Sequence, residues 1–385
     1  MDLTDRPRQQ PRRERDLLPL IPQGVRCYFG EEVNRRRKAE AVIAAVARNW
    51  GFHEIILPFF DFLEDFVYGL GSQLGERVYR FLDKDGSLLA LRPDLTTLVA
   101  KTVATRMANH PLPIKLFYSG EVFRQEKAGA GQQKEFYQIG LESMGVSATW
   151  ADIEILLIAV DCLLHLGVEE FKLALGHVGL FNGIVSGLDI SPEKRQALRE
   201  AIDHRDSGSL EHEVAGLSLS EPKRRFLTEL PHLTGGREVV EAGLSIVRNP
   251  QARRALRELG EIHSVFDGLG MGRWLSLDLG EVRGLDYYTG ILFRIYSSTQ
   301  GLELGGGGRY DGLPGKFGWD IPAVGFSFTL DSMLSLISGP QTLQVPGCDG
   351  DEFILPAEGA SCMELFRKAW NLRREGRCIH LGRMP

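Results

Sequence analysis

The sequence predicts an α+β fold in which an antiparallel sheet is flanked by helices, with a helical insertion and a short C-terminal α/β appendage. Three features favour this class: hairpin-joined strand patterns dominate the first half, a helical pattern fills residues 191–271, and strand patterns then return. We therefore expect a flexible tail at 1–17, a main domain at 18–338 that contains the insertion, and a small appendage at 339–385 that docks on the main domain.

The first half is predicted to run helix, strand, hairpin, helix and two longer strands. Apolar residues at helical spacing in 31–50 are followed by Gly51, a common helix C-cap residue. An Ile-Ile-Leu run predicts a strand at 54–58, and alternation over 77–90 around Asp85-Gly86 predicts a hairpin. The remaining elements are a helix with Asp94 as its N-cap that runs to Arg106, and strands at 114–121 and 136–143.

Helices are expected to fill the middle of the chain. The pattern over 151–166 predicts an amphipathic helix, and a strand at 171–175 follows it. Prolines at or near helix starts mark the all-helical segment at 191–271. The strands expected after it lie at 275–279, 291–296, 303–304 and 323–328, with a helix from Thr329, and the appendage is assigned a strand at 353–355, a helix at 361–374 and a strand at 377–381.

Composition narrows the class of protein. With 385 residues, 43% of them hydrophobic, and a net charge of −6, the chain is typical of a folded protein without a generic polyanion-binding surface. The tail lacks the apolar core of a signal peptide, and the most apolar run, 155–160, is far shorter than the ~20 residues that span a bilayer. Five scattered cysteines predict reduced thiols and no metal site. We expect a cytoplasmic protein that has no membrane contact and no cofactor.

Polar residues and glycines gather where predicted strands end. Because strand residues two apart share a face, Arg124 and Glu126 project together, as do Gln138, Gly140 and Glu142. Carboxylates, an amide and arginines around an open glycine floor suit a zwitterionic small molecule. The four clusters are 92–96, 123–142, 282–290 and 305–311.

Each cluster taken alone also has a purely structural interpretation. Arg124 and Glu126 can form a cross-strand ion pair, and Gly305–Gly308 can form a turn. Tyr287 and Tyr288 can pack in the core. The four clusters together, in this order, are far more specific than any one of them.

In this order the clusters resemble the catalytic domain of the class II histidyl-tRNA synthetases, over roughly residues 18–338. The Arg-Gly-Leu-Asp-Tyr-Tyr string is the most specific match. The helix ending near Asn49 and the strand ending at Pro58 resemble the first motif, which builds a homodimer interface; 123–126 resembles the second motif, 283–288 the histidine-specific peptide, and 323–326 the start of the third motif.

The resemblance implies a nearly complete amino-acid pocket. Asp94 stands where the family usually carries the longer glutamate, which changes the reach of that contact. The residues implied to bind histidine are Asp94 and Thr96 for the α-ammonium, Gln138 and Arg283 for the carboxylate, Glu142 and Tyr288 for the imidazole, and Tyr287 beside them.

The residues that the resemblance assigns to nucleotide binding are only partly retained. Two arginines that the family uses around ATP are replaced here by Gln132 and Ser332, while Arg124 and Glu126 remain. If each lost arginine contributed about 1.5–3 kcal/mol, adenylation would fall by roughly 10²–10⁴-fold. The resemblance therefore implies a vestigial nucleotide site and no efficient adenylate formation.

The C-terminal segment also departs from the synthetases. Only 47 residues follow residue 338, whereas an anticodon-binding domain needs about 100. The combination resembles a paralogous family, the regulatory subunits of the short-form ATP phosphoribosyltransferase. That resemblance implies a non-catalytic protein that binds L-histidine, does not bind tRNA, and forms a hetero-octamer with the short catalytic subunit. It also implies that the chain is required for the first step of histidine biosynthesis and mediates its feedback inhibition.

Two alternatives stay open at this point. One is a truncated, active histidyl-tRNA synthetase-like enzyme that adenylates histidine, for which the retained Arg124, Glu126 and Arg283 argue. The other is a dimeric scaffold whose pocket is vestigial. Histidine-dependent pyrophosphate exchange and capture of the catalytic subunit separate these alternatives from the regulatory hypothesis.

Overall fold

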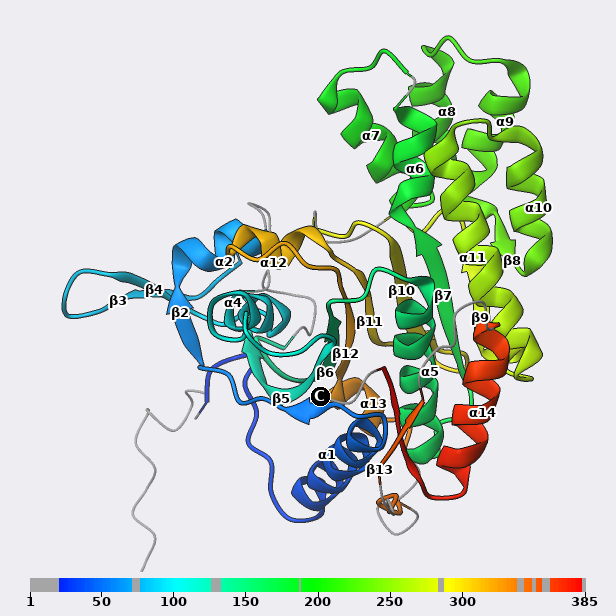
Figure 1. The fold of residues 1–385 in the computed structure, drawn as a ribbon. Coiled ribbons are helices and arrows are strands. Elements are labelled where there is room, and N and C mark those ends of the chain that lie inside the picture. The colour runs from blue at the N-terminus through cyan, green and yellow to red at the C-terminus, as the bar shows by residue number, and fades with distance from the viewer. Residues whose placement is uncertain are drawn as a thin grey trace, which may run out of the picture.

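The structure is a computed structural model, and it has the predicted α+β architecture (Figure 1). It describes residues 21–70, 77–125, 133–186, 188–282, 287–337, 343–347, 351–354 and 361–382, and every statement below concerns these residues. The predicted tail at 1–17 lies outside them.

Nine strands of the described chain form one sheet, in the order β1-β5-β6-β12-β11-β10-β7-β9-β8. Neighbours pair antiparallel except β1 with β5 and β7 with β9, so the predicted antiparallel character is confirmed for most of the sheet. The strands are β1 His53–Glu54, β5 Ile114–Phe123, β6 Glu135–Met144, β7 Phe171–His177, β8 Thr234–Gly235, β9 Leu275–Asp278, β10 Ile291–Ser297, β11 Glu303–Arg309 and β12 Ala323–Thr329.

Helices cover both faces of this sheet. Helix α4 (Thr96–Arg106) lies on one face, and α1 (Glu31–Asn49) and α5 (Thr149–His165) lie on the other (Figure 1). Alternate residues of β5 follow the same division: Phe117 belongs to the apolar cluster around α5, whereas Leu116 and Tyr118 belong to the cluster around α4.

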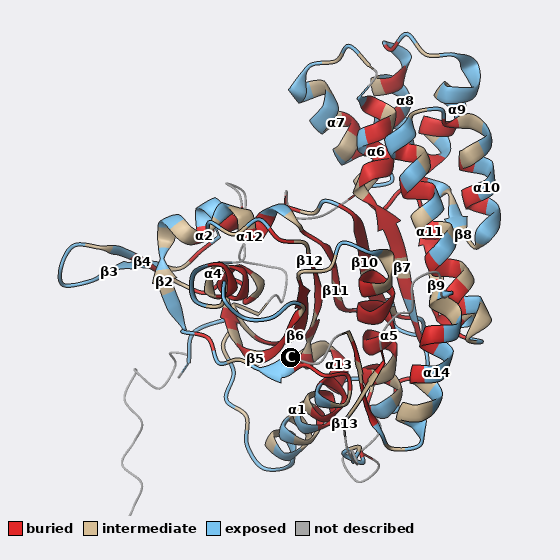
Figure 2. Cartoon of the chain, viewed as in Figure 1, coloured by how far each residue is buried: buried red, intermediate tan, exposed pale blue. Residues whose placement is uncertain are grey.

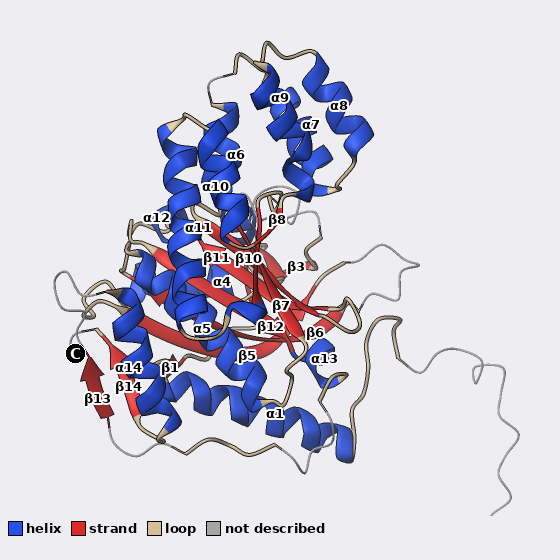
Figure 3. Ribbon diagram, turned by 90° about the vertical axis from the view of Figure 1, so that its right-hand side faces the viewer, coloured by secondary structure: helices blue, strands red, loops and turns tan. Residues whose placement is uncertain are grey.

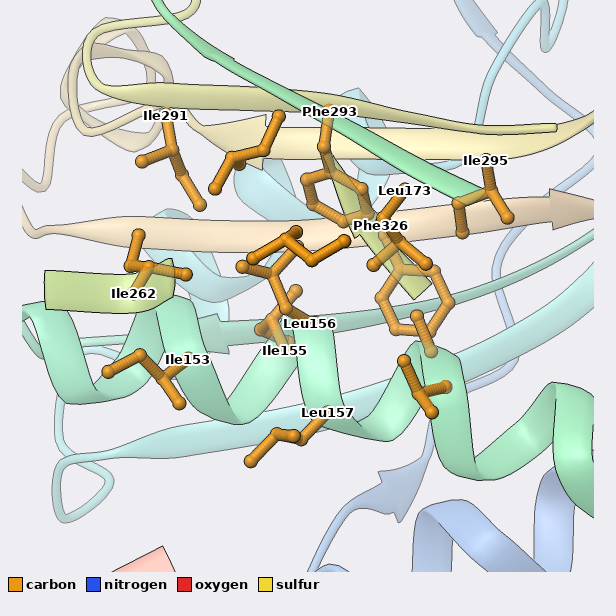
Figure 4. Packing of buried hydrophobic residues seen from close by; sticks show 14 of the residues in the cluster. Ile153, Ile155, Leu156, Leu157, Leu173, Ile262, Ile291, Phe293, Ile295 and Phe326 are labelled. Atoms are coloured by element: carbon orange, nitrogen blue, oxygen red, sulfur yellow. The ribbon is translucent and has the colours of Figure 1, made fainter. Parts of the chain in front are cut away.

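Helix α5 is more deeply buried than an amphipathic helix, which corrects the prediction made for 151–166. Every residue from Ala151 to Val160 is buried, because the sheet, α1 and α11 surround the helix (Figure 2). Figure 4 shows Leu156 near Leu173 and Phe326. The acidic residues of α5 are compensated by buried cations: Asp152 pairs with Arg309 and Glu154 pairs with Lys115.

Part of the predicted helical segment projects beyond one end of the sheet, whereas α11 (Pro250–Gly268) runs back along the sheet and packs against α5 and β7 (Figure 3). Three of its helices carry proline in their first turn, as expected from the sequence. The two-residue strand β8 is an exception within the segment and pairs with β9. The helices of the segment are α7 Pro192–Asp203, α8 Ser207–Ala215, α9 Glu221–Glu229, α10 Arg237–Ile246 and α11 Pro250–Gly268. Helix α6 (Val178–Val185) precedes the segment and was not predicted.

The strand predicted at 54–58 is wrong for most of its length. Only Glu54 is in β1, because the guanidinium of Arg92 donates to the carbonyls of Leu57 and Pro58 and so replaces a strand ladder there. The predicted hairpin is confirmed as strands β3 (Arg80–Leu82) and β4 (Leu88–Leu91). A further strand that was not predicted, β2 (Phe60–Phe62), pairs with β4 to form a three-stranded sheet, next to α2 (Leu63–Leu70).

The glycine run 305–308 is the centre of strand β11, not a turn. It pairs with β10 on one side and β12 on the other. A Cβ atom on Gly307 would lie 2.1 Å from the carbonyl oxygen of Gly325, so the strands approach too closely for a side chain. Strand β12 then leads into α13 (Leu330–Leu334), and α12 (Gly312–Lys316) connects β11 to β12.

The C-terminal segment docks on the main body, as expected. Its strands β13 (Asp351–Ile354) and β14 (Cys378–Leu381) are parallel and joined by α14 (Cys362–Arg374). Lys115 donates to the carbonyl of Leu381 over 3.0 Å. Cys378 is disulfide-bonded, which corrects the expectation that all cysteines are reduced, whereas Cys27, Cys162 and Cys362 are free.

Candidate functional site

A cavity of about 400 Å³ lies on the α4 side of the sheet, between the start of α4 and strands β6, β10, β11 and β12. The predicted residues that line it are Asp94, Thr96, Arg124, Gln138, Glu142, Tyr287 and Tyr288. Arg283, Glu126 and Gln132 lie outside the described residues. Ser332 is described but is not part of the cavity lining.

Glu142 lines the cavity and is 1% exposed. Among the described residues, its Oε1 accepts from Thr96 Oγ1 at 2.8 Å and from the Tyr118 hydroxyl at 3.0 Å, and its Oε2 accepts from the Tyr310 hydroxyl. Burial raises the pKa of Glu142 to about 7, although these hydroxyl groups lower it. A carboxylate can accept about four hydrogen bonds, so the three donors leave room for about one more.

Two glycines make room for this carboxylate and its partners. Gly325 lies opposite Glu142 on β12, and a Cβ there would be 1.6 Å from Glu142 Oε2. A Cβ on Gly140 would be 2.3 Å from the Tyr118 hydroxyl oxygen. The space above Gly140 is therefore filled by Tyr118 and is not the open floor of the pocket that the sequence suggested.

Asp94 combines a structural contact with a place in the cavity lining. Its Oδ1 accepts from the Thr97 backbone N–H at 3.1 Å, as a capping side chain does, but the N-cap residue of α4 is Leu95, one residue after the predicted position. Its side chain is buried, and burial raises its pKa, while the charge of Arg124 lowers it. The carboxylate is thus held at the edge of the cavity by the helix that follows it.

Gln138 has an unused polar atom. Its Nε2 donates to Ser327 Oγ at 3.0 Å, but its buried Oε1 has no hydrogen-bond partner among the described residues. Because the Ser327 hydroxyl can also donate, the amide can turn over and present its N–H groups instead. Leaving a buried polar atom unpaired costs about 1–3 kcal/mol, so a ligand that pairs with it gains affinity.

The cavity lining also carries two arginines, Arg124 and Arg294. Arg124 donates to the Pro93 carbonyl at 2.8 Å, and its guanidinium lies 5.0 Å from the centre of the Phe136 ring. Arg294 is held by Glu303 at 3.1 Å and by Glu281 at 3.5 Å.

The tyrosines form one aromatic wall. The rings of Tyr287 and Tyr288 are 4.9 Å apart, and Tyr287 is 5.8 Å from Tyr310. Tyr287 belongs to the apolar cluster around α4 and also lines the cavity, so the core interpretation and the pocket interpretation both hold for it. Burial raises the pKa of Tyr287 well above its ordinary value, which keeps its hydroxyl protonated.

Ser332 lies on α13 next to Asp331, whose carboxylate has a structural role. Asp331 accepts from Tyr28, from Arg36 and from the backbone N–H of Tyr137. These contacts tie α13 to α1 and β6. Ser332 thus belongs to a helix whose acidic residue, Asp331, is used for packing.

Several lining residues were missed as individuals. Tyr310 lies within a cluster that the sequence singled out, but its role depends on β11 pairing beside β12. Arg294 had a weak signal, a charged residue within an otherwise apolar strand, and Glu303 faces it from β11. The other lining residues that were not predicted are Phe136, Leu292, Phe293, Gly305, Gly306, Gly307, Gly325, Phe326, Ser327 and Thr329.

Known proteins resemble this chain over most of its length. A family model described as histidyl-tRNA synthetase matches residues 24–333. An "ATP phosphoribosyltransferase regulatory subunit" of Moorella thermoacetica is 37% identical over 367 residues, which is 94% of this chain and 92% of that protein. One of Syntrophotalea carbinolica, with the same name, is 37% identical over 316 residues, 82% of this chain and 74% of that protein.

A solved structure agrees with the fold. It is that of an ATP phosphoribosyltransferase regulatory subunit/histidyl-tRNA synthetase from Bacillus halodurans, with a TM-score of 0.77 and 26% identity. The match covers 94% of this chain and 92% of that one. The described part of this chain contains no helix long and apolar enough to cross a membrane, and no described group of His, Cys, Asp and Glu could hold a metal ion.

Proposed function

Because this chain belongs to the histidyl-tRNA synthetase family, and within it to the ATP phosphoribosyltransferase regulatory subunits, we propose that it is a non-catalytic regulator of histidine biosynthesis. Its cavity would bind L-histidine, the feedback signal. The chain would be required by a short-form catalytic subunit that performs the first step of the pathway. The observation that carries the proposal is that Asp94, Thr96, Gln138 and Glu142 line one cavity.

The cavity suits histidine in size and in chemistry. A volume of about 400 Å³ lies at the small end of the range for small-molecule sites. The remaining acceptor position of Glu142 would take an imidazole N–H beside Tyr288. Asp94 and Thr96 would take the α-ammonium, and Gln138 with Arg283 the carboxylate.

The nucleotide side supports regulation over catalysis. Gln132 and Ser332 stand where the family uses arginines, and neither can give a phosphate a bidentate cation. Arg294 lines the cavity, but Glu303 and Glu281 hold its guanidinium. Histidine-dependent ATP–pyrophosphate exchange tests this reasoning, because robust exchange would instead establish a truncated synthetase-like enzyme that adenylates histidine.

Assembly is part of the proposal. We expect a homodimer through α1 and the strand after it, since Phe29 and Ile56 flank these elements and are 81% and 91% exposed. We also expect a cytoplasmic hetero-octamer with the catalytic subunit, and no binding of tRNA. Light scattering of the purified chain with and without the catalytic subunit measures both assemblies; a monomer that captures no catalytic subunit would contradict the proposal.

Calorimetry with three ligands tests the cavity directly. L-histidine should bind, whereas histamine, which lacks the carboxylate, and imidazole propionate, which lacks the ammonium, should each bind roughly 10- to 100-fold more weakly. L-Histidine should also lower the rate of the reconstituted transferase. Absence of histidine binding at millimolar concentration, alone and with the catalytic subunit, would leave a dimeric scaffold with a vestigial pocket.

A further inference from the structure

A second, larger cavity of about 670 Å³ lies where helices α1, α5, α11 and α14 end. It shares no lining residue with the histidine cavity. Its described lining carries the guanidinium groups of Arg273, Arg373 and Arg374, together with His165. Asp161 is the acidic residue of that lining, so the cationic groups are in excess.

Two of these arginines lie over aromatic rings, and none of the three forms an ion pair with a carboxylate among the described residues. The Arg273 guanidinium lies 4.2 Å from the centre of the Trp274 ring, and that of Arg373 lies 3.4 Å from the centre of the Trp50 ring. Arg373 Nη2 donates to the Ile379 carbonyl, while its buried Nε and Nη1 have no hydrogen-bond partner among the described residues.

The carboxylate of Asp161, in the cavity lining, already has hydrogen-bonding partners. Asp161 accepts from Trp50 Nε1 at 2.8 Å with its Oδ2 and lies 3.2 Å from His165 Nδ1 with its Oδ1. Helix C-termini attract cations, which explains why basic residues gather here. However, backbone N–H groups of the residues that follow already bond to the last carbonyls of all four helices, so the guanidinium groups are not needed as caps.

The rest of the wall is largely apolar. Trp370 and Trp274 face the cavity together with Leu164 and Met271. Trp274 is fixed by stacking on Phe171, with ring centres 5.7 Å apart. The site thus combines an apolar wall with arginines that form no ion pair within the described residues, and this is the complement of an amphipathic anion.

We propose that this cavity binds a small organic anion whose flat apolar body packs against Trp370 and whose phosphate or carboxylate group is held by Arg273 and Arg374. Arg373, which also lines the cavity, adds positive potential. Both contacting arginines are exposed at the rim, so their side chains can turn toward the ligand.

Ligand binding to the full chain tests the inference, read by tryptophan fluorescence and calorimetry. The probes are 1-naphthyl phosphate and 1-naphthoate, which distinguish the two acid groups, with uncharged 1-naphthalenemethanol and inorganic phosphate as controls. We expect at least one aromatic anion to bind about tenfold or more tightly than either control, and more weakly as salt is raised. Saturating L-histidine should not compete. Equal binding of the uncharged analogue, or no binding of either anion at millimolar concentration, would overturn the proposal.

Two variants locate the anion. Arg273→Gln and Arg374→Gln should each weaken binding about tenfold, which corresponds to ~1.4 kcal/mol. The matched control is Lys368→Gln, which removes an exposed cation from the same helix as Arg374 but outside the cavity. All three variants should keep wild-type unfolding temperatures and histidine affinity. Unchanged anion affinity in the double arginine variant would place the ligand elsewhere and refute the assignment.

Discussion

Replacing Glu142 by glutamine tests the histidine cavity at its centre. Glutamine has nearly the same shape, but its amide nitrogen cannot accept the hydrogen bonds that Thr96, Tyr118 and Tyr310 donate to the carboxylate in the described structure. The substitution also removes the charge that would face an imidazole N–H. A hydrogen bond to a charged group contributes about 1.5–3 kcal/mol, so the Kd for L-histidine should rise roughly 10- to 100-fold.

The same substitution changes how stability depends on pH. Burial raises the pKa of Glu142 from its ordinary value of 4.5 to about 7, so the folded protein binds more protons than the unfolded chain between these values. The protonated carboxyl group therefore contributes its full stabilisation to the folded state below about pH 4.5, and this contribution is lost as the pH rises through 7. The loss amounts to roughly 3 kcal/mol, and it should be absent in the glutamine variant.

Calorimetry and denaturant titration at several pH values measure both effects. Wild-type affinity for histidine should increase, relative to the variant, as Glu142 ionises between about pH 6 and 8. Glu211→Gln, an exposed change on α8, is the matched control and should alter neither quantity. A glutamine variant that folds normally and binds histidine as tightly as wild type would refute the assignment of Glu142 to the imidazole.

Three other substitutions test the packing around the cavity and beneath the C-terminal strand. Gly325→Ala places a methyl group against Glu142, so we expect at least tenfold weaker histidine binding by calorimetry and a lower Tm. Tyr118→Phe removes a donor to Glu142, which should raise the pKa of that carboxyl group further and move the pH dependence of histidine affinity upward. Lys115→Met leaves Glu154 buried without its cation and should lower the free energy of unfolding by about 3–5 kcal/mol in urea titration.

Two of these changes have a control, and each of the three has an outcome that would contradict it. Gly208 lies on an exposed turn of α8, where an added Cβ would be 3.6 Å from Asp206 Oδ1. Gly208→Ala should therefore leave binding and stability nearly unchanged. Adding Glu154→Leu to Lys115→Met should restore most of the lost stability, since it removes the unpaired charge. Three results would contradict these contacts. Full histidine affinity in Gly325→Ala or an unchanged pH profile in Tyr118→Phe would contradict the contact with Glu142. Wild-type stability in Lys115→Met would contradict the ion pair with Glu154.

Local signals in the sequence were sufficient for most of the fold. The helix at 31–50, the hairpin around Asp85-Gly86 and the proline-started helices of 191–271 all depend on periodicity, turn residues and caps within a few positions of one another. The strand expected at 54–58 failed because a distant guanidinium, that of Arg92, takes the carbonyls of Leu57 and Pro58. No local pattern contains that contact.

The candidate site also combines features that the sequence predicts with features that depend on the tertiary structure. Pairs such as Gln138 and Glu142 share a face because residues four apart on a strand must do so, and this follows from the sequence alone. Which strand lies beside them does not follow from it. The pairing of β12 with β6 and β11 brings Gly325 and Tyr310 to Glu142, and it makes the glycine run a strand where a turn was possible.

The sequence by itself determined the class of fold, the order of its elements and the identity of most polar residues in the cavity. Only the tertiary structure decided that Tyr118 fills the space above Gly140, that Ser332 lies outside the cavity lining, and that a second cavity gathers three arginines. The physical reason is that propensity, capping and alternation act over a few residues. Burial, strand pairing and unpaired charge are instead set by segments that are far apart in the chain.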